Sequence, residues 1–335
     1  MNSQVTPPLT GSFRLGVFDT SVLTSDVISA LGRGVPSSIL AGMQHGTLRG
    51  FIPHYVWAEV PRVLADRKRE GGAFDFYAAE ALWWREYIPL LHVVPTTGLP
   101  MTPAADKIAH EDLSDIGAAQ LTGLIGPVVL LAEDRDLVRH GIAAQDWRKV
   151  RAGLGKLGGA ESKVRVNITL TLHASGGVAQ LARLARGHPV AAAVAAATVA
   201  FGAHRVRGRL KPETRAAWAE AGKTLATVFG MPFAEHQKHE AAWKEVEHGV
   251  PGVDLLSQVA RTLARSPEPL TRTTILQKLS LPLAEPHRRQ MDGLSRLLHR
   301  FPAFHQVEPG RWQLGRSNVQ VGRPAAMHAA VDSAT

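Results

Sequence analysis

The segment Arg14-Leu15-Gly16-Val17-Phe18-Asp19-Thr20-Ser21 decides the fold prediction for the first half of the chain. Its short apolar run at 14–18 is typical of a buried strand, and the run stops at one acid and two hydroxyl residues. Apolar side chains then recur with helical spacing from Val22 to Leu31. The segment therefore predicts a strand, an acidic corner and a helix.

This alternation of strands and helices continues to about residue 155. Strands are predicted at 92–94 and 128–132, and helices at about 55–69, 74–87 and 113–124, with a short apolar stretch at 51–53. Strands that alternate with helices form parallel sheets with helices on both faces. We therefore predict an α/β domain over residues 13–155.

A different pattern follows residue 155. The glycine-rich segment 153–159 predicts a boundary, and alanine-rich helical patterns over 160–249 predict a helical linker or partner-binding segment. Residues 250–316 contain three helical patterns and then two alternating runs joined by Glu308-Pro309-Gly310. That order predicts a winged helix-turn-helix, and the small, polar residues 317–335 predict a disordered tail.

Composition and charge restrict the classes of function. The 335 residues include no Cys, which excludes disulfides, thiolate metal sites and a cysteine nucleophile. No secretory signal is found in residues 1–15, so we expect a cytoplasmic protein. Residues 1–150 hold 13 Lys and Arg against 16 Asp and Glu, whereas residues 151–335 hold 25 against 13. The basic second half is suited to a polyanionic partner such as nucleic acid.

Acidic residues follow the predicted strand ends and helix starts. They are Asp19, Glu59, Asp115 and Asp134, with Asp136 two residues further on. The carboxyl ends of parallel strands meet at one edge of a sheet, where these carboxylates would repel one another unless a divalent cation neutralised them. Oxygen ligands favour Mg²⁺ or Mn²⁺, which can activate water for attack on a phosphodiester. The sequence therefore predicts metal-dependent phosphodiester hydrolysis.

Each acid also has a purely structural interpretation. Asp19 and Asp115 could cap helices, Glu59 could be a surface acid, and Asp134 and Asp136 could form a polar turn.

The ordered motifs resemble those of PIN-domain nucleases over roughly residues 13–150. They are Phe18-Asp19-Thr20-Ser21-Val22-Leu23, Ala58-Glu59-Val60, Asp112-Leu113-Ser114-Asp115-Ile116-Gly117-Ala118-Ala119 and Leu130-Leu131-Ala132-Glu133-Asp134-Arg135-Asp136-Leu137. The resemblance implies a three-layer α/β/α fold around a parallel sheet, a Mg²⁺ or Mn²⁺ site, and endonuclease activity, most often on RNA. By position, Asp19, Glu59, Asp115 and Asp134 match the family's four acids, and Asp136 an auxiliary one.

The C-terminal pattern looks like a winged-helix domain with a basic third helix. Arg288, Arg289, Arg296 and Arg300 fall on that helix, and Arg311 lies in the expected wing. In nucleic-acid-binding members the third helix enters a groove and the wing contacts the backbone. Winged helices also act as protein-protein modules, so contact with nucleic acid and contact with protein both remain open.

Residues 187–204 contain no Lys, Arg, Asp or Glu but are rich in alanine. Two interpretations stay open: membrane association, and a packed or partner-binding helix, which the modest apolar content favours.

Together these features predict a metal-dependent endoribonuclease, toxin-like or engaged in RNA processing. Its expected partners are RNA, DNA through the C-terminal domain, an antitoxin or other protein inhibitor, and a second copy in a homodimer. The alternative is a non-catalytic, winged-helix DNA-binding or regulatory protein with a degenerate PIN domain. Ala132 bears on this choice, because many PIN-domain proteins have a hydroxyl residue at the corresponding position.

Overall fold

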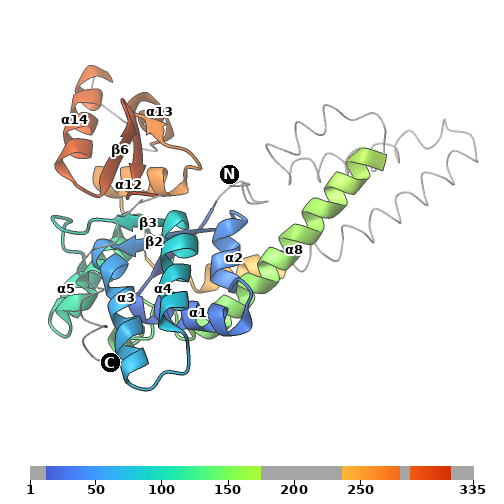
Figure 1. Ribbon diagram of the computed structural model, residues 1–335. Coiled ribbons are helices and arrows are strands. Elements are labelled where there is room, and N and C mark those ends of the chain that lie inside the picture. The colour runs from blue at the N-terminus through green and yellow to red at the C-terminus, as the bar shows by residue number, and fades with distance from the viewer. Residues whose placement is uncertain (1–12, 175–235, 250, 280–286, 318–335) are drawn as a thin grey trace, which may run out of the picture.

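The first half of the chain is an α/β structure with an all-parallel central sheet (Figure 1). The computed structural model describes residues 13–174, 236–249, 251–279 and 287–317, with side chains as far as residue 160 in the first range. Its sheet has the order β3-β2-β1-β4. The strands are β1 (Arg14–Phe18), β2 (Leu48–Pro53), β3 (Leu91–Val94) and β4 (Val129–Leu131).

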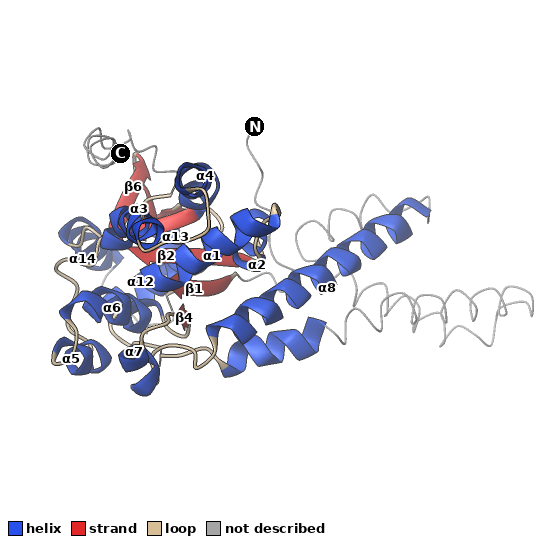
Figure 2. Ribbon diagram, turned by 60° about the horizontal axis from the view of Figure 1, so that its bottom comes forward, coloured by secondary structure: helices blue, strands red, loops and turns tan. Residues whose placement is uncertain are grey.

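Helices cover both faces of this sheet (Figure 2). They are α1 (Thr20–Arg33), α2 (Ser38–Gln44), α3 (His54–Arg69), α4 (Phe76–Leu82), α5 (Pro103–Ala109), α6 (Ile116–Ile125), α7 (Arg135–Arg139) and α8 (Trp147–Ala174). Alternate strand residues point to opposite faces. Val17 and Phe51 belong to the core on the α6 side, while Phe18 and Ile52 belong to the core on the side of α1 and α3.

The predicted elements are found with shifted ends. The expected helix at 74–87 is α4 followed by one π-helical turn, Trp83–Tyr87, and a 3-10 turn, Ile88–Leu90. The expected helix at 113–124 is a 3-10 turn, Leu113–Asp115, that leads into α6. The glycine-rich segment 153–159, expected as a boundary, lies inside α8. Its leucines, Leu154 and Leu157, are buried in the core, and this packing offsets the low helix propensity of the glycines.

The C-terminal module, residues 251–317, contains three helices and a second sheet. Its elements are α12 (Leu255–Arg265), β5 (Leu270–Thr271), α13 (Arg272–Lys278), α14 (His287–Arg300), β6 (Phe304–Glu308) and β7 (Arg311–Leu314). The three strands are antiparallel in the order β5-β7-β6. Residues 280–286, between α13 and α14, lie outside the described part.

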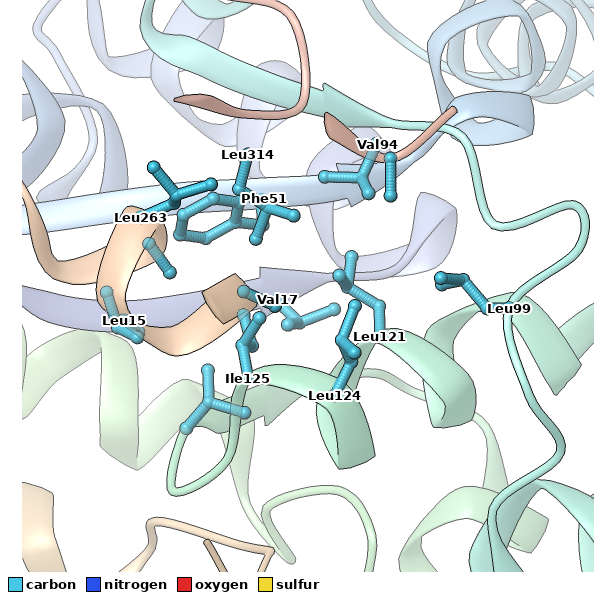
Figure 3. Packing of buried hydrophobic residues seen from close by; sticks show 14 of the residues in the cluster. Leu15, Val17, Phe51, Val94, Leu99, Leu121, Leu124, Ile125, Leu263 and Leu314 are labelled. Carbon is cyan, nitrogen blue, oxygen red and sulfur yellow. The ribbon is translucent and has the colours of Figure 1, made fainter. Parts of the chain in front are cut away.

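The module packs directly on the parallel sheet and shares a hydrophobic core with it. In Figure 3, Leu263 of α12 and Leu314 of β7 lie beside Phe51 of β2. Leu121 and Ile125 of α6 belong to the same cluster. Burial of apolar side chains from both parts stabilises their contact.

Polar contacts at the edge strand β3 complete this interface. Arg49 donates from Nη1 to the carbonyl oxygens of Ala264 (3.0 Å) and Ser266, and from Nε to His92 Nε2 at 3.0 Å. His92 Nδ1 lies 3.2 Å from the carbonyl oxygen of Leu314. Val93 and Arg316 exchange two backbone hydrogen bonds, of 2.9 and 2.8 Å, which cover the free edge of β3.

No helix among the described residues is long and apolar enough to cross a membrane. Residues 187–204, most of the segment expected at 160–249, and all but the first residue of the tail expected at 317–335 lie outside the described residues.

Candidate active site

Asp19 stands at the carboxyl end of β1 and caps α1. Its backbone N–H donates to the carbonyl oxygen of Leu131 at 3.0 Å, which fixes Asp19 beside the end of β4. Its Oδ2 accepts from the backbone N–H of Ser21 at 3.1 Å and from the Ser21 hydroxyl at 2.6 Å. Burial raises the pKa of Asp19, and the bonds from Ser21 partly oppose that rise. The structural role as a cap and a functional role are compatible here.

Glu59 lies on the second turn of α3 and faces the start of α1. The Thr20 hydroxyl donates to Glu59 Oε2 at 2.6 Å, and Arg62 Nη2 lies 2.8 Å from Glu59 Oε1. Glu59 also contributes to the raised pKa of Asp19 by charge repulsion. The structure therefore places Glu59 next to the Asp19 corner, with a half-exposed carboxylate that already has two partners.

Asp115 is the most unusual of the acids. It ends the 3-10 turn before α6, is 7% exposed, and has a buried Oδ2 to which no described residue donates a hydrogen bond. Burial, followed by the charges of Asp19 and Asp134, raises the pKa of Asp115 to about 7. A buried carboxylate that lacks a donor and faces other acids is unfavourable unless a proton or a cation compensates it.

Asp134 caps α7 directly after β4. Its Oδ1 accepts from the backbone N–H groups of Asp136 (2.6 Å) and Leu137 (3.2 Å). Asp136 itself is bound to Arg139, with 3.1 Å between Oδ1 and Nη2. Asp134 therefore serves as a helix cap whose charge also acts on Asp115, whereas the carboxylate of Asp136 is engaged in an ion pair.

The four acids lie in one neighbourhood at the carboxyl edge of the sheet. Asp115 interacts electrostatically with Asp19 and Asp134, and Asp19 does so with Glu59. Burial raises the pKa of the Tyr55 hydroxyl, and the charges of Asp19, Asp115 and Glu59 raise it further. The acids therefore influence one another's charge, while their convergence around a single cation stays a prediction.

The arrangement does not form a ready ligand set. Within the described ranges, no group of three His, Asp or Glu side chains is positioned to hold a metal ion. Hard cations bind oxygen ligands, and Asp115 Oδ2 is a buried oxygen without a partner among the described residues. Asp19 and Asp134 supply further carboxylate oxygens. The donor chemistry fits Mg²⁺ or Mn²⁺, and a bound ion would require the side chains to move closer together.

Family models, curated proteins and solved structures were compared with the chain. None of the three comparisons gives a match.

Three residues at this site were not assigned a role from the sequence: Thr20, Ser21 and Tyr55. Ser21 joins two strand ends, because its hydroxyl donates to Asp19 and accepts from the backbone N–H of Glu133 at 3.1 Å. Tyr55 packs against Gly117, where an added Cβ would lie 2.8 Å from its ring. The only sequence signal for these residues was their position, two or three places after a strand end.

A hollow of about 720 Å³ opens beside the carboxyl end of β4. Within it, Glu133 Oε1 accepts from Trp147 Nε1 and Arg148 Nη2, each at 3.1 Å. Glu133 is thus a structural neighbour of the acidic site. The lining residues are Ala132, Glu133, Val138, Gln145, Asp146, Trp147, Arg148, Lys149 and Ala152.

The expected nucleic-acid contacts lie on a different surface. Arg288, Arg289, Arg296 and Arg300 of α14 are all exposed, as is Arg311 of β7. Arg311 has an acidic neighbour, Glu308, whose Oε2 lies 3.7 Å from Nε. None of the four α14 arginines forms an ion pair with a residue in the described part of the chain.

Proposed function

We propose that this protein is a metal-dependent endoribonuclease whose acids are Asp19, Glu59, Asp115 and Asp134. One observation carries the proposal: the buried, unpartnered Asp115 carboxylate lies where the ends of β1 and β4 present Asp19 and Asp134. Repulsion among buried carboxylates destabilises the folded state, and carboxylates with such perturbed pKa values cluster at functional sites.

The chemistry follows from the donor set. A bound Mg²⁺ or Mn²⁺ would supply Lewis acidity at the phosphate and lower the pKa of a water molecule. Asp19, Asp115 and Asp134 would hold the cation, with Asp136 entering only after its release from Arg139. Hydrolysis adds water across one P–O bond: the water oxygen joins phosphorus, and the departing ribose oxygen takes a proton.

The chain's own residues position this set. Ser21 orients Asp19 through two hydrogen bonds, and Thr20 orients Glu59 through one. Ala132 offers no hydroxyl, but the Ser21 hydroxyl lies against the adjacent backbone N–H of Glu133. This contact supports an active site in spite of Ala132.

A cleavage assay tests the proposal. Purified protein with Mn²⁺ should cut labelled single-stranded RNA, and Asp19→Asn should lose the activity. Intact RNA with both proteins at millimolar Mn²⁺ would refute the nuclease proposal. In the cell we propose an RNA-processing or toxin-like role in the cytoplasm, with a protein inhibitor and a homodimer as expected assemblies.

The second candidate is a non-catalytic DNA-binding or regulatory protein. The absence of a three-ligand metal arrangement in the described ranges favours it, as does the exposed basic face of α14. The module's order of helix, strand, helix, helix, strand and strand is consistent with a winged helix. A gel shift of duplex DNA by both the wild type and Asp19→Asn, without cleavage of RNA, would support this candidate.

A further inference from the structure

The basic surface of α14 is concentrated on one face of the helix. Arg289, Arg296 and Arg300 are seven and then four positions apart, a spacing that places side chains above one another. Leu294 and Leu298, which are buried, lie on the opposite face and attach the helix to its module. The exposed face therefore presents a row of arginines without ion-pair partners in the described ranges.

This module is held firmly against the sheet. Arg49 bonds to carbonyl groups at the end of α12 and to His92 of β3. Arg261 Nη1 and Arg265 Nη2 reach the carbonyl oxygens of Gly126 (3.5 Å) and Pro127 (3.1 Å), just before β4. The contacts thus end on β2, β3 and the approach to β4, so the interface is spread over several strands of the sheet.

The hydrogen bonds of His92 at this interface define its tautomer. His92 Nε2 accepts from Arg49, so its proton lies on Nδ1 and is donated to the carbonyl oxygen of Leu314. Burial and the adjacent Arg49 charge hold the pKa of His92 well below its usual range. The neutral form of His92 is the one that makes both hydrogen bonds.

The helix that carries the arginines, α14, lies on the same side of the molecule as α6 and α7. In Figure 2, α14 lies on the left with α6 and α7, the helices that begin at Asp115 and Asp134, while α8 projects to the right. Figure 1 shows α14 on the left as well, on the same side as α5, which packs against α6. A nucleic acid that contacts both α14 and the acids must extend along this side of the sheet.

We propose that α14 anchors the double-stranded part of an RNA substrate, so that the acidic site cuts the adjoining single strand at a fixed distance from the duplex. This inference rests on the proposed nuclease function. An anchor can fix the distance between the bound stem and the cut only if the bound polymer is stiff. Nucleic-acid duplexes are stiff over many tens of base pairs. The arginines would bind phosphates, because side chains cannot read the deep, narrow major groove of A-form RNA.

The test uses the full chain and RNA hairpins that carry single-stranded tails of several sequences. The wild type with Mn²⁺ should cut each tail at the same number of nucleotides from the stem, whatever the tail sequence. Moving the stem by several nucleotides should move the cut equally. Cuts that follow tail sequence, or that ignore the stem, would overturn the inference while leaving the nuclease proposal standing.

A charge variant and a matched control identify the anchor. Replacement of Arg288, Arg289, Arg296 and Arg300 by Gln should scatter the cut positions and weaken binding to the stem by about 10- to 100-fold at moderate salt. The control replaces four exposed basic residues elsewhere, Arg33, Arg85, Lys156 and Lys238, by Gln, and it should retain the fixed position. An unchanged pattern in the α14 variant would refute the role of α14.

A binding measurement separates this inference from the nuclease proposal. With Asp19→Asn, which should not cut, footprinting should show stem protection that disappears when the α14 arginines are also replaced. Stem protection without any cleavage by the wild type would refute the nuclease proposal and the fixed cut together, and leave only a duplex-binding protein. Absence of stem protection would refute the anchor directly.

Discussion

Two buried aspartates in this protein have opposite surroundings. Asp26 of α1 is 0% exposed, and it accepts hydrogen bonds from Tyr87 at 2.7 Å and from Ser37, and pairs with Arg151 at 3.0 Å. Asp115 is 7% exposed, keeps an unpartnered oxygen and faces other acids. A structural carboxylate needs full compensation, whereas the described residues supply no hydrogen-bond donor or cation for Asp115 Oδ2.

Asp26→Ala should have the largest effect on stability. The change removes the carboxylate that joins α1, the cap of α2, the π-helical turn and α8, and it leaves Arg151 without its partner. Breaking a buried pair on one side costs about 3–5 kcal/mol. Urea unfolding measures this loss, and a loss below about 1 kcal/mol would mean that the network is not structural.

Asp115→Asn and Asp19→Asn should each lower the rate of RNA cleavage at least about 100-fold. This loss equals a rise of roughly 2.7 kcal/mol in activation free energy. The Asn amide has nearly the shape of the Asp carboxylate but lacks the negative charge that binds a cation. Asp112→Asn is the matched control, because Asp112 caps the same turn through Ser114 and should retain activity. Equal losses in all three variants would indicate damage to the turn and not to the chemistry.

In metal-free buffer, Asp115→Asn should stabilise the protein at pH 8 by about 1–2 kcal/mol, a value reduced for partial solvent screening. In the folded protein Asp115 keeps its proton until the pH approaches its pKa of about 7. In the unfolded chain it releases the proton near the ordinary pKa of an Asp, 3.8. Wild-type stability should therefore fall as pH rises between these values. Thermal unfolding of both proteins at pH 5 and pH 8 measures the difference, and an equal gain at both pH values would contradict the raised pKa.

Ser21→Ala should give the smallest change, about 1 kcal/mol of stability. The loss of the Ser21 hydroxyl raises the pKa of Asp19 further, since that bond favours the ionised carboxylate. The acid limb of the pH profile for cleavage should move to higher pH. A stability loss with an unmoved profile would show that Ser21 supports the fold alone.

The sequence predicted the acidic edge because that edge follows from strand order. The apolar runs that became β1 and β4 each end at an acid, and parallel pairing places those ends together. The structural interpretation of Asp19 as a helix cap is confirmed, whereas Asp115 makes no capping hydrogen bond to α6, and Asp134, expected in a polar turn, caps α7. The finer assignments, the nuclease activity and the winged helix, remain predictions.

Long-range partners were not predictable in the same way. Arg49 and His92 lie on neighbouring strands, yet their partners come from α12 and β7, more than two hundred residues along the chain. The pairing of Asp26 with Arg151 likewise depends on how α8 crosses α1. Local periodicity contains no information about such contacts, because they depend on the packing of whole elements.

Direct titration of Mn²⁺ is the measurement closest to the central claim, which is that the acids at the carboxyl edge capture a hard dication. Electron paramagnetic resonance reports free Mn²⁺, whose signal should fall as wild-type protein binds one ion per chain. Asp115→Asn should leave the signal near that of buffer, and Asp112→Asn should behave as wild type. An undiminished signal with the wild-type protein would contradict the claim.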